Sequence, residues 1–339
     1  MDQLVFRGYD VTLITYSDRE DIYCIDNHIH RVKIKHGSRI NKFRRLLVYF
    51  YSLKKNDIII SFGQLNNFVV LLCNIFFQRK IIVGERNLSI KTTNMEKILF
   101  QLYRKASFVV PNSHSQEKYI INHAPWLCKK TTCIINYTNT NIFKPDNLLL
   151  NTDKKEIIGI FARFNPQKNY IRFAKAIEII ANSGYKNFYF IWYGNMQNAD
   201  NTPNPYYLDF SSIINKRKIQ EYIELRNHTK EVSKSINQCN AICLPSLFEG
   251  FSNSISEAIA CGKPIIASNV SDNYVMVENQ TNGFLFNPYD VNDMAQTIIK
   301  YLNLSSVEKQ LMGENSRKKA EKLFNLEQFT QQYIRLINK

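Results

Sequence analysis

The sequence lacks any apolar run long enough to cross a bilayer. Its longest such run, FVVLLCNIFF at 68–77, is about half the length of the roughly 20 residues that a membrane-spanning helix needs. The opening residues, MDQLVFRGYD, also lack the basic and then apolar layout of a secretory signal peptide. We therefore expect a cytosolic protein.

Paired cysteines are missing as well. The seven cysteines are an odd number and are scattered, and the closest pairs, Cys128/Cys133 and Cys239/Cys243, have no matching second pair of the kind that binds zinc. We expect reduced structural thiols. The sharp nucleophile turn of the Ser-His-Asp hydrolases is absent too, which excludes that class.

One long segment has no acidic residue at all. Residues 31–56 hold nine basic residues, and the whole chain has a formal net charge of +15. A helix over 39–54 would carry basic and apolar side chains together, namely Lys42, Arg44, Arg45, Leu46, Val48 and Phe50. This composition favours an anionic membrane surface as partner. The alternative is an ordinary solvated basic face, and no nucleic-acid partner is expected.

Short apolar runs alternate with helix-length amphipathic segments through all 339 residues. Strands are predicted at 11–16, 30–34, 57–63, 80–85, 107–113, 131–137, 156–164, 187–194, 222–227, 241–246 and 263–268. Helices are predicted at 39–54, 66–78, 95–106, 114–123, from Asn253, after an N-cap at Asp290, and along the tail from about 305. Apolar strands with helices between them indicate parallel sheets covered on both faces. The predicted fold is α/β with two doubly wound, Rossmann-like domains.

The polar stretch 141–155 reads as a linker between these domains. We predict an N-terminal domain over 1–145 and a C-terminal domain over 152–320. The last segment, 321–339, is predicted as a helix that can cross back to the N-terminal domain. In such a pair of domains a ligand binds beyond the carboxyl ends of the strands.

The segment PSLFEGFSNSISEAIACGKPIIAS, at 245–268, places two carboxylates at such a strand end. Glu249 falls in the loop after the strand AICLP, and Glu257 lies about one turn into the following helix. The backbone N–H groups of Ser252, Asn253 and Ser254 would open that helix, and unpaired N–H groups at a helix start attract anions.

Two cations follow another strand of the same predicted domain. Arg163 and Lys168 lie in FARFNPQKN, after the strand at 156–164, and Gly194 ends the next strand. Two cations opposite a helix N-terminus can clamp a diphosphate, because each charge-assisted contact contributes about 1.5–3 kcal/mol. Taken singly, each of these residues is as easily explained by solvent exposure.

Together these residues resemble a known family. The segment from Glu249 to Glu257, EGFSNSISE, is similar to the glutamate-seven-glutamate motif of the retaining nucleotide-sugar glycosyltransferases of family 4, which have the GT-B fold. ARFNPQKN and SDNYVMVENQTNGFLFNPYDVNDMAQTI resemble further segments of that family. The resemblance covers about 156–303 closely and the first domain loosely.

The resemblance implies a catalytic role for Arg163, Lys168 and Glu249. Arg163 and Lys168 would hold the donor diphosphate, and Glu249 would contact sugar hydroxyls near the reacting carbon. Fixed positive charge would stabilise the negative charge that grows on the leaving diphosphate.

The resemblance also implies the rest of the donor site. Glu257 would accept the ribose hydroxyls, backbone around Phe251, Ser252 and Asn253 would orient sugar and phosphate, and Gly194 would adjoin the donor. Backbone around Asn227 and His228 would contact the base, for which a UDP-sugar, the family's commonest donor type, is expected.

No aspartate in the chain has a second aspartate two positions away. The metal-dependent glycosyltransferases use such a pair to hold the cation on the diphosphate. We therefore expect no metal and no other cofactor, with the Arg/Lys pair and the helix dipole in the metal's place.

The chain departs from the family pattern in its first domain. The first strand and its glycine-rich loop are absent before LVFRGYDVTLITY, which predicts an N-terminally truncated protein. Where many relatives have a histidine, this chain has Glu85, Arg86 and Asn87, and Arg86 is predicted to contact acceptor or donor. His114 could face the cleft, although a polar helix-start residue explains it equally simply.

The function predicted is a retaining hexosyltransferase that moves a sugar from a nucleotide diphosphate to a glycan acceptor. A lipid-linked acceptor at the inner face of the cytoplasmic membrane is expected, with the protein peripheral there. Bacterial surface polysaccharide (O-antigen, capsule or lipopolysaccharide core) is the setting that the resemblance implies. Two alternatives stay open: a non-catalytic, membrane-associated relic of such an enzyme, and a nucleotide-sugar epimerase on the same fold.

Overall fold

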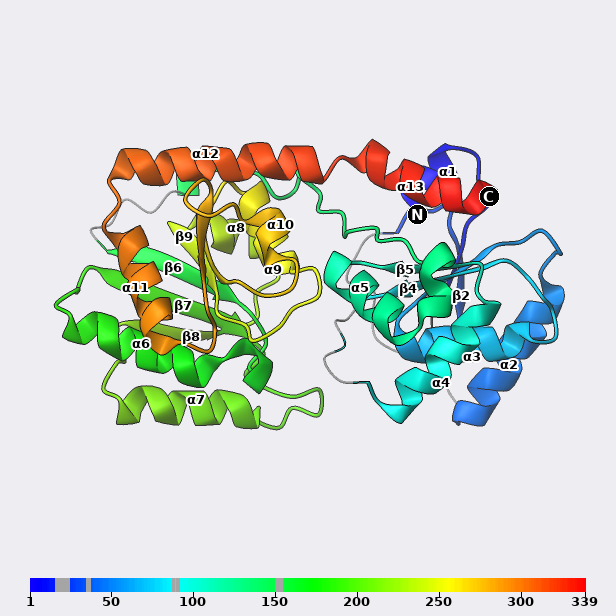
Figure 1. The fold of residues 1–339 in the computed structure, drawn as a ribbon, viewed down its shortest axis with the longest axis horizontal. Helices are drawn as coiled ribbons and strands as arrows, with labels where there is room; N and C mark the ends of the chain where they lie inside the picture. The colour runs from blue at the N-terminus through cyan, green and yellow to red at the C-terminus, as the bar shows by residue number, and fades with distance from the viewer. Residues whose placement is uncertain (16–24, 35–37, 87–88, 90–91, 150–154) are drawn as a thin grey trace. The chain divides into compact units, whose positions relative to one another are not determined.

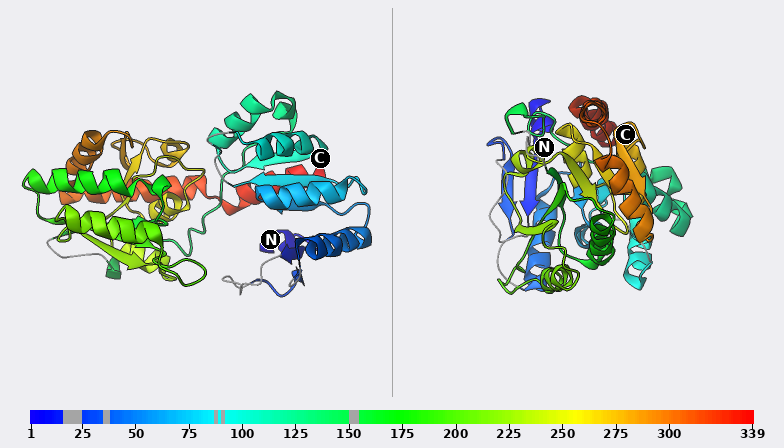
Figure 2. Two further views of the ribbon diagram at one scale, coloured as in Figure 1. Left: turned by 90° about the horizontal axis from the view of Figure 1, so that it is seen from below. Right: turned by 90° about the vertical axis from the view of Figure 1, so that its left-hand side faces the viewer.

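The computed structural model describes residues 1–339 apart from 16–24, 35–37, 87–88, 90–91 and 150–154. The chain divides into two units (Figures 1 and 2). Unit 1 comprises Met1–Asn112, Gln116–Ile134 and Leu326–Lys339, and unit 2 comprises Ser113–Ser115 and Ile135–Asn325. The chain thus enters unit 2 ahead of the polar stretch 141–155.

Unit 1 is built on parallel strands in two groups. Strand β1 (Thr12–Thr15) pairs with β2 (His30–Lys33). Strand β4 (Ile81–Glu85) lies between β3 (Ile59–Phe62) and β5 (Phe108–Pro111), and both pairings are parallel. Every residue of β4 is buried, as expected for the middle strand of a covered sheet.

The helices along this part of the chain cover those strands. They are α1 (Asp2–Phe6), α2 (Arg39–Ser52), α3 (Gln64–Asn74), α4 (Asn94–Leu102) and α5 (His114–His123), with 3-10 turns at Tyr103–Lys105 and Pro125–Lys130. Helix α2 buries Leu46 and Phe50 in the core of unit 1. The last helix, α13 (Leu326–Asn338), buries Tyr333 and Leu336 against Ile82 and Val110 of the same unit.

Unit 2 holds one parallel sheet with the strand order β11-β10-β9-β6-β7-β8. Its strands are β6 (Glu156–Phe161), β7 (Phe188–Gly194), β8 (Ile223–Asn227), β9 (Ala241–Leu244), β10 (Ile265–Ser268) and β11 (Gly283–Phe286). The chain order reverses between β6 and β9, which is the switch point where doubly wound sheets bind ligands.

Helices lie on both faces of this sheet (Figure 1). One face carries α6 (Tyr170–Asn182), α7 (Pro205–Lys216) and α11 (Val291–Leu302), and the other carries α8 (Val232–Asn237), α9 (Asn253–Ala260) and α12 (Ser306–Leu323), with the short α10 (Asn273–Met276) beside α9. Right-handed crossovers that run in opposite directions from the switch point produce this division. Ring contacts join Phe173 of α6 and Phe210 of α7 to Trp192 of β7.

The predicted strands appear with slightly shorter ends, except for the one at 131–137, which was wrong. That segment forms only an isolated bridge from Thr131 to Val109, although the Ile134 N–H donates to the Pro111 carbonyl at 3.0 Å. Because Pro111 has no N–H to return, a ladder cannot continue there. Strand β11, in the short run GFLF, was not predicted.

Two helix starts were predicted correctly. Helix α9 begins at Asn253. The Asp290 carboxylate caps α11 by accepting from the N–H groups of Asn292 and Asp293. The tail consists of two helices, α12 and α13, which are separated at Phe324 and Asn325.

None of the helices in the described part of the chain is both long and apolar enough to cross a membrane. The cysteines among the described residues form no disulfide with one another.

Candidate active site

The strongest feature of unit 2 is a buried ion pair at the carboxyl ends of its strands. Lys168, in the 3-10 turn Pro166–Lys168 after β6, donates from Nζ to Oε1 of Glu249, in the loop after β9. Lys168 is 9% exposed and Glu249 is 8% exposed. Burying a charge costs several kcal/mol, which the attraction between the two charges must offset. A buried pair of this kind is therefore a candidate for a functional role.

One backbone hydrogen bond and one from a side chain hold the two loops against each other. The Leu247 N–H donates to the Gln167 carbonyl at 2.8 Å, and Gln167 Nε2 donates to the Phe248 carbonyl at 2.8 Å. The Asn165 side chain accepts from the Lys168 N–H at 3.2 Å and fixes the turn. The position of Lys168 beside Glu249 is therefore set by the backbone on both sides.

Arg163 differs from Lys168 in its surroundings. It lies two residues beyond β6 and is exposed. The structure thus presents one buried and one exposed cation after the same strand, where the sequence had suggested two equivalent ones.

The N-terminus of α9 follows directly from the loop of Glu249. Ser252 caps the helix, with its hydroxyl facing the Ile255 N–H at 3.5 Å. Ser252 and Phe251 are buried, and Phe251 packs edge-to-face against Phe324 with centroids 6.2 Å apart. Asn253 is exposed, and its Oδ1 accepts from Asn136 Nδ2 at 3.0 Å.

Glu257 lies in the second turn of α9 and is half-buried. Burial raises the pKa of its carboxyl from 4.5 to about 7. A carboxyl with this pKa changes its protonation state near neutrality.

Gly194 and Asn227 lie opposite each other at the ends of β7 and β8. A Cβ on Gly194 would lie 2.6 Å from the Ala162 carbonyl oxygen, so packing alone requires a glycine there. The Asn227 side chain joins the loops after β7 and β8, because its Oδ1 accepts from the N–H groups of Met196 at 3.4 Å and of His228 at 2.9 Å.

Arg86 belongs to unit 1, where it follows β4 directly. Its guanidinium lies 4.5 Å from the centroid of the Phe62 ring. Its neighbour Asn87 lies outside the described residues. His114 is the first residue of α5, which agrees with its interpretation as a polar helix-start residue.

Sequence reasoning named Glu85, at the end of β4, but did not predict that its carboxylate is buried. It is 1% exposed, and it accepts from the Tyr103 hydroxyl, which also accepts from Asn67 Nδ2 at 3.0 Å. Burial raises the pKa of Glu85 to about 7. The one available signal was a glutamate closing the apolar strand IIVGE.

Comparison with known proteins places these features in context. Residues 144–319 match the family described as glycosyl transferases group 1. An α-1,3-galactosyltransferase of Escherichia coli, which is named for UDP-Gal and α-D-GlcNAc-diphosphoundecaprenol, is 28% identical over 171 residues, or 50% of this chain and 42% of that one. The capsular polysaccharide biosynthesis glycosyltransferase CapM of Staphylococcus aureus is 23% identical over 94% of this chain and 87% of its own.

Solved structures share the fold of this chain. Anabaena Alr3699/HepE, crystallised with UDP-glucose, superposes with a TM-score of 0.80 at 17% identity and covers 92% of this chain and 86% of that one. At such low identity this similarity shows the fold only, and the chemistry has to be argued from the residues of this chain.

Proposed function

Because the chain belongs to the group 1 glycosyltransferases and has the GT-B fold, we propose that this glycosyltransferase moves a sugar from a UDP-sugar to a lipid-linked glycan with retention of configuration. The observation that carries the proposal is the buried pair of Lys168 and Glu249 at the carboxyl ends of β6 and β9.

In this proposal the ion pair is the resting arrangement of the donor site. A bound diphosphate offers Lys168 a stronger anion, and Glu249 is then released to accept from hydroxyls of the donor sugar. Arg163, exposed after the same strand, adds a second cation. The negative charge on the leaving diphosphate grows in the transition state, so fixed cations there lower the barrier, and each such group contributes about 3–4 kcal/mol. The mechanism includes no metal or other cofactor.

The start of α9 supplies the remaining contacts. Backbone N–H groups from Ser252 and Asn253 point at the diphosphate, as helix N-termini do for anions. Glu257 accepts the ribose hydroxyls, and backbone near Gly194 and Asn227 meets the base. Arg86 of unit 1 is our proposed contact for acceptor or donor.

The relatives motivate the choice of donor and acceptor. The E. coli protein carries UDP-Gal and a diphosphoundecaprenol acceptor in its name, and CapM is named for capsular polysaccharide. We extend these features to this chain as a peripheral enzyme of surface polysaccharide biosynthesis at the inner face of the cytoplasmic membrane. Lipopolysaccharide core and O-antigen belong to the same class of product.

Helix α2 supports membrane contact. Its outward side exposes Ile40 by 72%, Val48 by 71% and Tyr51 by 81%, and Arg44 on the same stripe is exposed as well. Apolar side chains among cations are typical of helices that lie in the headgroup layer of anionic membranes.

Thermal-shift binding with UDP, GDP, TDP and their sugars tests the donor site. We expect selective stabilisation by UDP and UDP-sugars. Glu257→Ala should lower the apparent affinity for them roughly tenfold, because it removes the carboxylate that accepts hydrogen bonds from the ribose hydroxyls. Glu221→Ala, at an exposed position beyond α7, is the matched control. Equal stabilisation by all three nucleotides, or none by any, would contradict the proposed donor.

Vesicle flotation tests the membrane contact. The protein should float with phosphatidylcholine vesicles that contain phosphatidylglycerol and sink with vesicles that lack it. Val48→Ser should weaken flotation, whereas Ile171→Ser, on an exposed position of α6, should not. Equal flotation of both variants would remove α2 from the proposal.

A further inference from the structure

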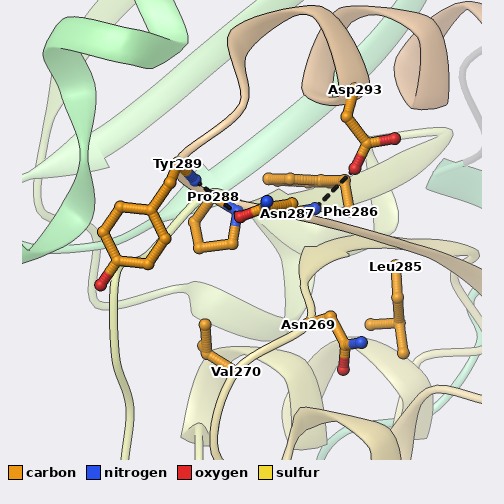
Figure 3. Close-up of a pocket in the computed structure, with 8 residues that line it drawn as sticks. All are labelled: Asn269, Val270, Leu285, Phe286, Asn287, Pro288, Tyr289 and Asp293. Atoms are coloured by element: carbon orange, nitrogen blue, oxygen red, sulfur yellow. Dashed lines mark hydrogen bonds between the residues drawn. The ribbon is translucent and has the colours of Figure 1, made fainter.

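A separate pocket opens at the carboxyl ends of β10 and β11 in unit 2. It encloses about 360 Å³, which is within the roughly 300–1,000 Å³ of typical ligand pockets. Figure 3 shows side chains from the loop after β10 on one side and from the loop after β11 on the other. The lining residues are Asn269, Val270, Leu285, Phe286, Asn287, Pro288, Tyr289 and Asp293.

The lining combines an apolar floor with a polar rim. Phe286 and Pro288 are buried, while Asn269, Asn287 and Tyr289 are exposed at the edge. Asp293 is half-buried, and its Oδ2 accepts from the Asn287 N–H at 2.7 Å. A ligand that fits this pocket therefore needs an apolar face for the floor and hydrogen-bonding groups for the rim.

This combination decides between ligand classes. The lining has a carboxylate and no lysine, arginine or histidine, so a phosphate in the pocket would be repelled by Asp293 and would contact no cation of the lining. A purely apolar ligand would desolvate the amides and the carboxylate without replacing their hydrogen bonds. A pyranose meets both requirements, because its C–H faces are apolar and its hydroxyls form a polar rim.

Two hydrogen bonds tie the pocket to the loops of the ion pair. Asn169, next to Lys168, donates from Nδ2 to the Pro288 carbonyl at 2.8 Å. The Glu249 N–H donates to the hydroxyl of Ser271, next to Val270, at 3.2 Å. Each side of the pocket is thus anchored to one partner of the pair.

Both anchoring residues have left-handed backbone. The φ angle is 59° at Asn169 and 49° at Ser271. Asparagine adopts this conformation more readily than most residues, whereas it is uncommon for a serine such as Ser271 and concentrates where the surrounding structure holds a functional geometry. The Arg172 guanidinium also lies 5.7 Å from the centroid of the Tyr289 ring.

We propose that this pocket is a subsite for an uncharged glycosyl unit, placed beside the donor phosphates by its two links to the loops of Lys168 and Glu249. The inference rests on the proposed function for its setting, since a sugar transferase must hold saccharide next to its nucleotide. The same chemistry can come from the acceptor glycan or from the donor sugar.

Saturation-transfer NMR on the full chain tests the subsite directly, with glucose, galactose and N-acetylglucosamine as probes, each with and without UDP. We expect transfer to at least one of these sugars. Tyr289→Ala and Asn269→Ala should each weaken binding roughly five- to tenfold, because each removes a rim contact. Tyr274→Ala, at an exposed tyrosine of α10 outside the lining, is the matched control and should bind as the parent chain does.

Kinetics with the UDP-sugar that supports turnover distinguish the two sources. A rise in acceptor KM alone in Tyr289→Ala assigns the subsite to the acceptor, and a rise in donor KM with unchanged UDP binding assigns it to the donor sugar. The subsite would be overturned if no saturation transfer to any of the three sugars is seen. It would also be overturned if Tyr289→Ala and Asn269→Ala bind these sugars as well as the control variant does. UDP binding is scored separately, so a failed donor site and a failed subsite give different results.

Discussion

The two units each bury a glutamate at a strand's carboxyl end, and they neutralise it in different ways. In unit 2, Glu249 after β9 receives the ammonium group of Lys168. In unit 1, Glu85 at the end of β4 receives the phenol of Tyr103, and its Oε2 has no hydrogen-bond partner among the described residues. Burial is nearly the same, at 8% and 1% exposed.

The two partners, an ammonium group and a phenol, give the two glutamates different chemistry. The Lys168 ammonium group forms an ion pair with Glu249, and an anionic substrate can compete with Glu249 for that cation. The Tyr103 phenol donates one hydrogen bond to Glu85, which lowers the pKa of the carboxyl less than its loss of water contact raises it. The pKa of Glu85 is therefore raised to about 7. The first arrangement suits diphosphate chemistry, and the second holds a proton near neutrality.

Removing the cation should have the largest effect. Lys168→Met strands the buried Glu249 carboxylate, so we expect unfolding free energy to fall by about 3–5 kcal/mol. Transfer activity should fall roughly a hundred- to a thousandfold, because the leaving diphosphate loses a fixed positive charge. Urea unfolding and initial rates with a UDP-sugar measure the two effects.

A second lysine–glutamate pair provides the control. Lys309→Met breaks the partly buried pair with Glu156, the first residue of β6, and should cost less unfolding free energy than Lys168→Met, because water reaches more of this pair. The double variant Lys168→Met/Glu249→Leu should recover stability without recovering activity. Full turnover in Lys168→Met would refute the role of the pair.

Replacing the titratable carboxyl of Glu85 should have the next largest effect, on the pH dependence of the unfolding free energy. The pKa of Glu85 is raised from 4.5 to about 7 by burial, so between these pH values the folded chain keeps a proton that the unfolded chain has lost. Stability contributed by this group is complete below pH 4.5 and falls as pH rises toward 7. The whole change is on the order of 3 kcal/mol.

Glu85→Gln should therefore flatten part of the pH dependence, as measured by urea unfolding at pH values from about 4.5 to 8. Burial also raises the pKa of Glu257 to about 7, so Glu257 should still contribute to the pH dependence of the unfolding free energy in Glu85→Gln. Glu257→Gln is the matched comparison in unit 2. UDP should change the contribution of Glu257 and leave that of Glu85 unchanged. An unchanged slope in Glu85→Gln would show that Glu85 is ionised in the folded chain across this range.

The smallest expected effect belongs to the phenol. Tyr103→Phe removes the hydrogen bond to Glu85, which should cost about 1–3 kcal/mol and raise the pKa of Glu85 further, because that bond favours the ionised form. Tyr119→Phe, whose hydroxyl lies 2.6 Å from Thr92 Oγ1 at a half-buried position, should cost less than about 1 kcal/mol. Equal losses in the two variants would mean that Glu85 has no special dependence on Tyr103.

Local patterns in the sequence carried much of this architecture. The apolar runs placed β6 to β10, Asp290 marked the start of α11, and small polar residues after Glu249 marked the start of α9. Each of these depends on neighbours a few residues away, through backbone propensity, capping or periodicity. The placement of Glu249 and Lys168 after strands followed from the same reasoning.

The partners of these side chains could not be read from local patterns, because they come from distant parts of the chain. Lys168 and Glu249 are 81 residues apart, and they meet because β6 and β9 are neighbours at the point where the strand order reverses. The pKa of Glu85 is raised because α3 and Tyr103 close over the end of β4 and exclude water. Sequence fixes which groups can ionise, whereas desolvation and long-range contacts fix whether they do so, since both depend on how distant segments pack.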